Sequence, residues 1–137
     1  MTSFPESGTI DEKVNTFKEL ISQKQIKLKA KTFKQREHTL GTKEWLKRVK
    51  RDIKDHKTPA SMLFASEDVS ALINKYCGTG EIVFRDVKQV YPVEFVTADH
   101  VVGKVWNSGL GRYVNTSRFE IRYSSDGFHI HPVKEKR

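Results

Sequence analysis

The stretch T-S-R-F-E-I-R-Y-S-S-D-G-F-H-I-H-P, residues 116–132, decides the fold. Polar and apolar residues alternate on both sides of Asp126-Gly127, and a period of two is typical of strands, whose side chains point alternately to the two faces of a sheet. An Asp-Gly pair between two such runs is a strong hairpin signal, because a type I′ turn needs positive φ at both central residues. We therefore predict a β-hairpin with Asp126 and Gly127 at its turn.

The predicted turn also sets the cross-strand register. The expected pairs are Ser125 with Phe128, Ser124 with His129, Tyr123 with Ile130, and Arg122 with His131. One face of the hairpin is then apolar, and the other carries Arg118, Glu120, Arg122, Ser124, His129 and His131. A polar strand face often does no more than meet solvent. Clustered titratable groups are also typical of functional sites, and no other part of the sequence gathers proton-transfer and anion-binding groups so densely.

The length of 137 residues suggests a single domain. No stretch approaches the roughly 20 apolar residues of a membrane span, and the opening residues MTSFPESG lack the apolar core of a signal peptide. We therefore expect no membrane association. Cys77 is the single cysteine, which excludes an internal disulfide and a zinc finger.

The net charge of +8 is concentrated in one quarter of the chain. Residues 24–57 hold 13 Lys and Arg against four Asp and Glu, a net charge of +9, whereas the remainder holds 12 against 13. A localised basic segment indicates a polyanionic partner, nucleic acid first. The alternatives are an acidic protein, a membrane surface, or a helix face that binds nothing.

The order of the elements predicts an α+β fold. Residues 1–8 form a flexible lead, residues 9–80 a mainly helical, basic half, residues 81–133 an antiparallel sheet, and residues 134–137 a polar tail. In such folds helices pack on one face of the sheet. We expect a twisted sheet of about four to five strands whose other face is uncovered and carries the polar cluster.

Local signals place the individual elements. The predicted helices are 10–23 with a capping box at Thr9 and Glu12, a second after an N-cap at Thr42, and a third after an N-cap at Ser66 that ends with Gly78 at C′. The stripe expected to be buried on the second helix is Trp45, Leu46, Val49 and Ile53. The predicted strands are 81–84, 93–97, 101–106, 112–115, 118–124 and 128–132, with a further short one possible at 60–64.

His129-x-His131 places two imidazoles on one strand face, which could bind a metal ion. A catalytic metal would need a third ligand, for which Glu120 is the nearest choice, and the neighbouring arginines would oppose a cation. We therefore expect no metal and no cofactor.

Two histidines beside cationic groups suit the metal-free cleavage of RNA. RNA supplies its own nucleophile, the 2′-hydroxyl, so one group must accept that proton and another must protonate the departing 5′-oxygen. Histidine is apt because both of its protonation states are available near neutral pH. Arg or Lys can then stabilise the additional negative charge on the pentacovalent phosphorus.

An ordered set of short motifs resembles a known family. The motifs are Gln35-x-x-His38-x-x-Gly41-Thr42, Ser61-x-Leu63, YCGTGE at 76–81, EFVTAD at 94–99, and Thr116-x-x-Phe119-x-Ile121-x-Tyr123-Ser124-x-x-Gly127-x-His129-Ile130-x-Pro132. Over about residues 20–133 the chain resembles the bacterial polymorphic toxin type 50 domain, which also occurs at the ends of phage head-morphogenesis proteins. That family is assigned to the barnase–EndoU–colicin–RelE class of metal-independent ribonucleases. The resemblance implies RNA cleavage that leaves a 2′,3′-cyclic phosphate.

The resemblance also implies particular site residues. It makes a catalytic candidate of His38, which its spacing alone would leave on the surface. Carried over with His38 are Ser61, Thr116, Tyr123, Ser124 and His129, and the polar face of the hairpin adds Arg122, His131 and Glu120 as further catalytic candidates. Family members often carry His where Arg122 stands and an aliphatic residue where His131 stands, so an imidazole has changed strands or activity is lost.

We expect His129 and His38 to be the acid–base pair, in either order, and Arg118 with Arg122 to bind the scissile phosphate. The residues expected to hold the RNA backbone are Arg118, Lys27, Lys29, Lys31, Lys34, Arg36, Lys47 and Arg51. The expected partners are RNA in the bacterial cytoplasm and a small acidic immunity protein. The alternative is a non-catalytic, phage-encoded or nucleic-acid-binding module that keeps the fold.

Overall fold

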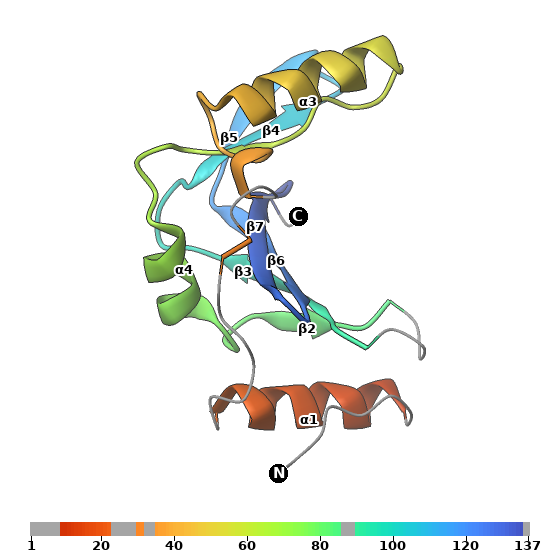
Figure 1. Cartoon of the computed structure of the whole chain (residues 1–137), viewed down its shortest axis with the longest axis vertical. Coiled ribbons are helices and arrows are strands. Elements are labelled where there is room, and N and C mark those ends of the chain that lie inside the picture. The colour runs from red at the N-terminus through yellow and green to blue at the C-terminus, as the bar shows by residue number, and fades with distance from the viewer. Residues whose placement is uncertain (1–8, 23–29, 32–34, 86–89, 136–137) are drawn as a thin grey trace.

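The computed structural model describes residues 9–22, 30–31, 35–85 and 90–135 (Figure 1). The helices in these ranges are α1 (Ile10–Ser22), α3 (Lys43–Lys54) and α4 (Val69–Tyr76). The strands are β1 (Met62–Leu63), β2 (Glu81–Val83), β3 (Val93–Thr97), β4 (Gly103–Asn107), β5 (Arg112–Thr116), β6 (Arg118–Ser124) and β7 (Gly127–Pro132). No described helix has the length and apolar character needed to cross a bilayer.

The strands form two antiparallel sheets, so the α+β prediction is confirmed. The larger sheet has the order β2-β3-β6-β7, within the predicted size, and the smaller has the order β1-β4-β5. The smaller sheet was not predicted, because alternation identifies strands without identifying their neighbours. The sheets meet closely at Gly103, where an added Cβ would lie 2.2 Å from the carbonyl oxygen of Met62 and 2.8 Å from Cγ of Pro132.

The core lies on the apolar face of the four-stranded sheet. Phe119, Ile121 and Ile130 are fully buried there, and α1 contributes Phe17, whose ring centre is 4.8 Å from that of Tyr123. The predicted capping box starts α1: Thr9 Oγ1 accepts from the Glu12 amide and Glu12 Oε2 accepts from the Thr9 amide. Helix α3 instead lies beside β4 and β5, at the opposite end of the molecule from α1 (Figure 1).

The hairpin exists, but its predicted register is wrong by two residues. Arg122 pairs with His129, and Ser124 pairs with Gly127, so Ser125 and Asp126 form the turn. The cause is the backbone of the turn: Gly127 alone takes a positive φ, of 140°, while Ser125 and Asp126 do not. A type I′ turn is therefore excluded. A shift of two leaves every side chain on its predicted face, whereas a shift of one would reverse them all.

The predicted buried stripe of α3 is wrong in part, because Trp45 and Val49 are half-buried but the other two members are exposed. Leu46 is 47% exposed and Ile53 is 60% exposed, while Asp52 is only 5% exposed. Asp52 faces inward because its Oδ2 accepts a hydrogen bond from the amide of Ala60 at 3.0 Å, and its Oδ1 lies 3.5 Å from Nε of Arg48. The polar contacts of Asp52 therefore act together with the packing of Trp45 against Tyr113 in orienting this helix.

The helix-end signals gave mixed results. Thr42 is the N-cap of α3, as predicted, and accepts from the amide of Trp45 at 3.1 Å. Gly78 follows the C-cap of α4 with φ of +82°, a left-handed conformation that glycine adopts readily. Ser66 does not cap α4; Asp68 does, through the amides of Ser70 and Ala71.

Candidate functional site

The polar face of β6 and β7 borders a hollow of about 290 Å³. Its lining side chains come from five separate parts of the chain: His38, Arg48, Ser61, Arg122, His129 and His131. Arg122 and His129 are direct cross-strand partners on neighbouring strands. This set, called the histidine hollow below, unites the predicted residues of the hairpin with His38 and Ser61.

His38 reaches the hollow because hydrogen bonds on two sides hold its turn. Gln35, which is 7% exposed, donates through Nε2 to the Ile130 carbonyl and accepts through Oε1 from the Ile130 amide, both at 2.8 Å. On the other side the amide of Leu63 donates to the His38 carbonyl at 2.6 Å. Gln35 thus extends the edge of β7, and the segment around His38 bridges β7 and β1.

The three imidazoles of the hollow are close neighbours. The ring centre of His38 is 4.8 Å from that of His131 and 6.0 Å from that of His129, and the latter two are 6.0 Å apart. The predicted acid–base pair, His38 and His129, therefore belongs to a group of three imidazoles. Of the other two rings, that of His131 is the nearer to His38.

Glu120 contacts one imidazole and one guanidinium group of the hollow. Its side chain is 4% exposed, with Oε2 3.0 Å from Nε2 of His131 and Oε1 accepting from Nε of Arg122 at 2.9 Å. Burial alone raises the pKa of Glu120, but the hydrogen bond from His131 and the charge of Arg122 outweigh it and lower the pKa to about 2. Glu120 is thus an ionised carboxylate near neutral pH.

The expectation of an uncovered polar face is therefore wrong in part. Glu120 is almost fully enclosed and the His131 side chain is 13% exposed, whereas Arg122 is 46% exposed. The turn that carries His38 lies over the end of this face, which explains the enclosure. The site is a partly closed hollow and not a flat surface.

Burial also determines the charge state of His38. Desolvation, followed by repulsion from His131, His129 and Arg48, lowers its pKa to about 3, although a hydrogen bond with the Ser61 backbone acts in the opposite direction. His38 is accordingly neutral near pH 7. A neutral imidazole can accept a hydrogen bond or a metal ion through one ring nitrogen.

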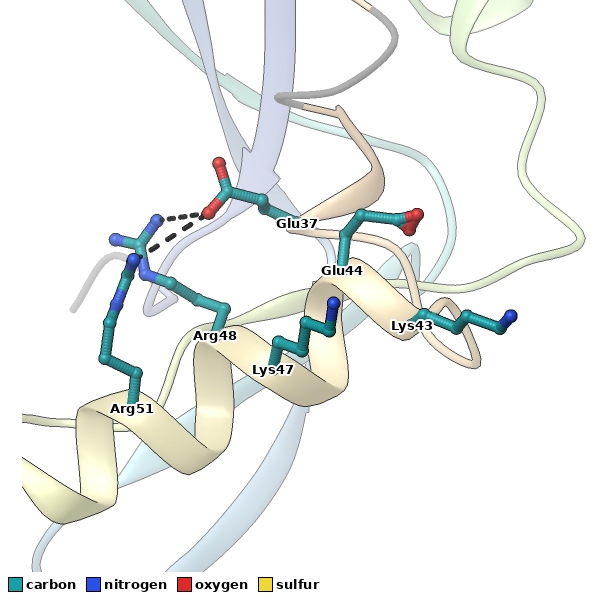
Figure 2. Close-up of a pocket in the computed structure, with 6 residues that line it drawn as sticks. All are labelled: Glu37, Lys43, Glu44, Lys47, Arg48 and Arg51. Carbon is teal, nitrogen blue, oxygen red and sulfur yellow. Dashed lines mark hydrogen bonds and ion pairs between the residues drawn. The ribbon is translucent and has the colours of Figure 1, made fainter.

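Arg48 connects the histidine hollow to the basic face of α3. It also lines an adjoining hollow of about 400 Å³ with Glu37, Lys43, Glu44, Lys47 and Arg51. Figure 2 shows Arg48 and Arg51 both directed at Glu37. Oε2 of Glu37 lies 3.2 Å from Nη1 of Arg48 and 3.9 Å from Nη2 of Arg51. Sequence reasoning did not select Arg48 or Gln35 for the site; Gln35 opens the motif that contains His38, whereas no local motif distinguishes Arg48 from neighbouring basic residues.

Several residues that the resemblance selects lie outside the hollow. Thr116 is fully buried, and its hydroxyl donates to the Val133 carbonyl at 2.7 Å. Tyr123 points into the core, where it donates to Oε1 of Glu94 at 2.6 Å and burial raises its pKa. The Ser124 hydroxyl bonds to Asp126 within the turn.

The predicted RNA-binding residues are divided between several surfaces. Arg118 stacks over the ring of Phe95 at 4.6 Å, and Lys31 lies 3.5 Å from Asp126. Arg36, Lys47 and Arg51 are exposed. Lys27, Lys29 and Lys34 lie outside the described residues.

Comparison with known protein families gives a match over most of the chain. The sequence model of a family described as bacterial toxin 50 matches residues 30–132, which include every lining residue of the histidine hollow. No curated protein and no solved structure matches the chain significantly.

Proposed function

Because the chain belongs to the bacterial toxin 50 family, we propose that it is a toxin domain that cleaves RNA without a metal ion. The 2′-hydroxyl attacks the adjacent phosphorus, the 5′-oxygen departs, and a 2′,3′-cyclic phosphate remains. One observation carries this proposal: three imidazoles and two guanidinium groups line a single hollow beside a basic helix.

Within the described part of the chain, His131 is the one of the three imidazoles that a carboxylate orients, which suits it to accept the 2′-hydroxyl proton once substrate binding exposes its buried Nδ1. Its Nε2 faces the ionised Glu120 and therefore carries the ring proton, which leaves Nδ1 with a lone pair. A carboxylate behind an imidazole also stabilises the imidazolium that forms when the proton is taken up. We assign His131 as the base, a role for which sequence reasoning selected His129 or His38.

His129 is then the proton donor to the departing 5′-oxygen. It lies two residues from His131 on the same strand face, with 6.0 Å between ring centres, so one phosphate can contact both rings. Arg122, the cross-strand partner of His129, and Arg48 stabilise the additional charge on phosphorus. His38, held neutral, accepts or donates a hydrogen bond that positions the reacting ribose.

The basic face of α3 holds the RNA backbone. Lys43, Lys47 and Arg51 line the hollow next to the histidine hollow, and Arg48 belongs to both (Figure 2). A strand of RNA bound along α3 would thus reach the imidazoles. The same face would attract a small acidic immunity protein, and its target RNA would be met in the bacterial cytoplasm.

The alternative hypothesis is a nucleic-acid-binding module without catalytic activity. One observation favours it: both guanidinium groups of the hollow already contact carboxylates, Arg122 with Glu120 and Arg48 with Glu37 and Asp52. These contacts reduce the positive charge available to a phosphate.

Digestion of a short RNA in EDTA distinguishes a ribonuclease from a non-catalytic binding module. Wild-type protein should produce fragments ending in 2′,3′-cyclic phosphate, His131→Gln and His129→Gln should each cleave about 10²–10⁴-fold more slowly, and His56→Asn should cleave like wild type. A matching RNA with 2′-O-methyl groups should bind and remain intact. If wild-type protein binds the unmodified RNA without cleaving it, the non-catalytic binding module is the correct hypothesis.

A further inference from the structure

His38, His129 and His131 each offer a ligand atom, and these atoms all lie within 4.8 Å of one another. We propose that the three imidazoles bind one divalent transition-metal ion, zinc above all, and that the bound ion inhibits the toxin. The inhibitory part rests on the proposed ribonuclease activity, whereas the binding part does not.

The separation of the ligand atoms suits this ion after small side-chain rotations. Zn–N bonds of about 2.0–2.1 Å in tetrahedral geometry place ligand nitrogens about 3.3–3.4 Å apart. The ligand atoms already lie within 4.8 Å of one another, and they come from two structures that are hydrogen-bonded together, β7 and the turn held by Gln35. The backbone segments that carry the three rings are thus already held together.

The surroundings of two of the rings fit metal ligation. Ligating histidines nearly always donate their second ring N–H to a carboxylate or a backbone carbonyl. His131 has this contact with Glu120, and His38 hydrogen-bonds to the backbone of Ser61. The Nδ1 atoms of His38 and His131 are buried and have no hydrogen-bond partner among the described residues, which is uncommon for buried polar atoms.

The nearby arginines determine the fourth ligand rather than exclude the ion. Arg48 contacts Glu37 and Asp52, and Arg122 contacts Glu120, which Arg85 also contacts at 3.3 Å, so carboxylates offset part of their charge. Three protein ligands leave one coordination position open. With two guanidinium groups lining the same hollow, this position favours an anion such as hydroxide or chloride.

Metal binding would stop proton transfer. A metal ion uses the same imidazole lone pairs that take up and return protons, so an imidazole bound to zinc is neither a base nor an acid at neutral pH. Inhibition should be reversible, because a chelator that removes the ion restores the lone pairs. The toxin would thus remain inactive wherever free zinc is high and become active where it is scarce.

Binding is tested with metal alone. Wild-type protein stripped with EDTA and exchanged into chelator-free buffer is titrated with Zn²⁺ against a chromogenic chelator, and with Co²⁺ while visible absorption is recorded. One equivalent should bind, with the absorption of tetrahedral cobalt. His38→Gln, His129→Gln and His131→Gln should each bind at least about tenfold more weakly, while His56→Asn should bind like wild type.

A second measurement does not depend on the variants folding. In wild-type protein, the imidazole NMR signals of His38, His129 and His131 should shift together on addition of one equivalent of Zn²⁺, and those of His56 and His100 should not. Shifts confined to His100, or no shift at equimolar zinc, would overturn the site.

RNA cleavage separates the two proposals. Zn²⁺ at one equivalent should reduce the cleavage seen in EDTA at least about tenfold, in line with the loss of a proton-transfer group, and excess EDTA should restore it. Full cleavage with zinc absent from the hollow overturns only the metal site. If zinc binds in the hollow but no cleavage occurs in EDTA, the proposed activity is wrong and so is the inhibition. If cleavage requires zinc, the inhibitory role is wrong.

Discussion

His131 directs Nε2 at the buried carboxylate of Glu120, 3.0 Å away, while its Nδ1 is buried beside the rings of His38 and His129. The two residues are cross-strand partners on β6 and β7. Because the carboxylate is enclosed and ionised, it fixes which nitrogen carries the proton. Catalysis in the proposed function depends on this pair more than on any other contact in the hollow.

Replacing Glu120 with Gln should therefore reduce kcat while KM changes little. The amide can still accept from His131, but it cannot stabilise the imidazolium, and we expect a loss of about ten- to a hundredfold, part of the 10²–10⁴-fold that a proton-transfer group supplies. The measurement is steady-state cleavage of a short RNA in EDTA. Glu135→Gln, an exposed carboxylate bonded to Ser117, is the control, and an unchanged kcat in Glu120→Gln would remove His131 as the base.

Gln35 is predicted to be a positioning residue for His38. Gln35→Ala removes both hydrogen bonds to Ile130 and leaves a buried backbone pair without partners, so the free energy of unfolding should fall by about 1–3 kcal/mol. In the folded variant kcat should also fall, because the turn no longer holds the imidazole. Urea denaturation and RNA cleavage measure the two effects. Asn115→Ala, at an exposed position of β5, should change neither, and a destabilised Gln35→Ala with wild-type kcat would limit Gln35 to a structural role.

The basic face of α3 should set the salt dependence of RNA binding. Lys47→Gln and Arg51→Gln each remove one exposed cation, and each should lower the slope of log K against log salt concentration by about 1 if that cation meets a phosphate. Binding of the 2′-O-methyl RNA measures this without cleavage. Lys75→Gln on α4 removes a cation that pairs with Asp99 and should leave the slope unchanged. If all three variants keep the wild-type slope, the RNA does not bind along α3.

The sequence predicted the faces of the hairpin but not how the site is closed. A period of two places Glu120, His129 and His131 on one side of β6 and β7 for both the predicted and the observed turn, because the two registers differ by two residues and not by one. The approach of His38 depends on Gln35 bonding to Ile130, 95 positions away, and no local pattern encodes such a contact. Only the resemblance to a known family selected His38.

The same limit explains the error in α3 and the choice of Glu120 as the nearest third ligand. Periodicity suggested that Leu46 and Ile53 were buried, yet they are exposed while Asp52, which accepts from the amide of Ala60, faces inward. Sequence spacing offered Glu120 as the third ligand beside His129 and His131. In the structure Glu120 supports His131 instead, and His38 completes the group of ligand atoms.

Tyr123 is expected to matter for stability and not for cleavage. It lies on the core face of β6 and donates to Glu94, which also accepts from the amides of Gly78 and Gly80. Tyr123→Phe should lower the free energy of unfolding by about 1–3 kcal/mol, since hydrogen bonds to charged groups are worth more than neutral ones. Thermal denaturation and kcat are measured on the same samples. A large loss of kcat in well-folded Tyr123→Phe would show that Tyr123 contributes to cleavage and not only to stability.

The stability of the metal-free protein should fall on mild acidification because of His38. Its pKa is about 3 in the folded protein and about 6.5 in an unfolded chain. Between these values the unfolded chain binds more protons, so the free energy of unfolding decreases as the pH falls through this window. The charges that oppose protonation of His38 are those of His131, His129 and Arg48.

Between pH 7 and pH 5 this effect amounts to about 2 kcal/mol at most. The window lies above the range in which Glu120, with its pKa of about 2, takes up a proton in the folded protein. Urea denaturation in EDTA at both pH values should show a smaller loss for His38→Gln than for wild type, whereas His56→Asn should lose as much as wild type. If His38→Gln loses as much stability as wild type, the imidazole is not held neutral in the hollow, and its assigned role as a neutral hydrogen-bonding group fails with it.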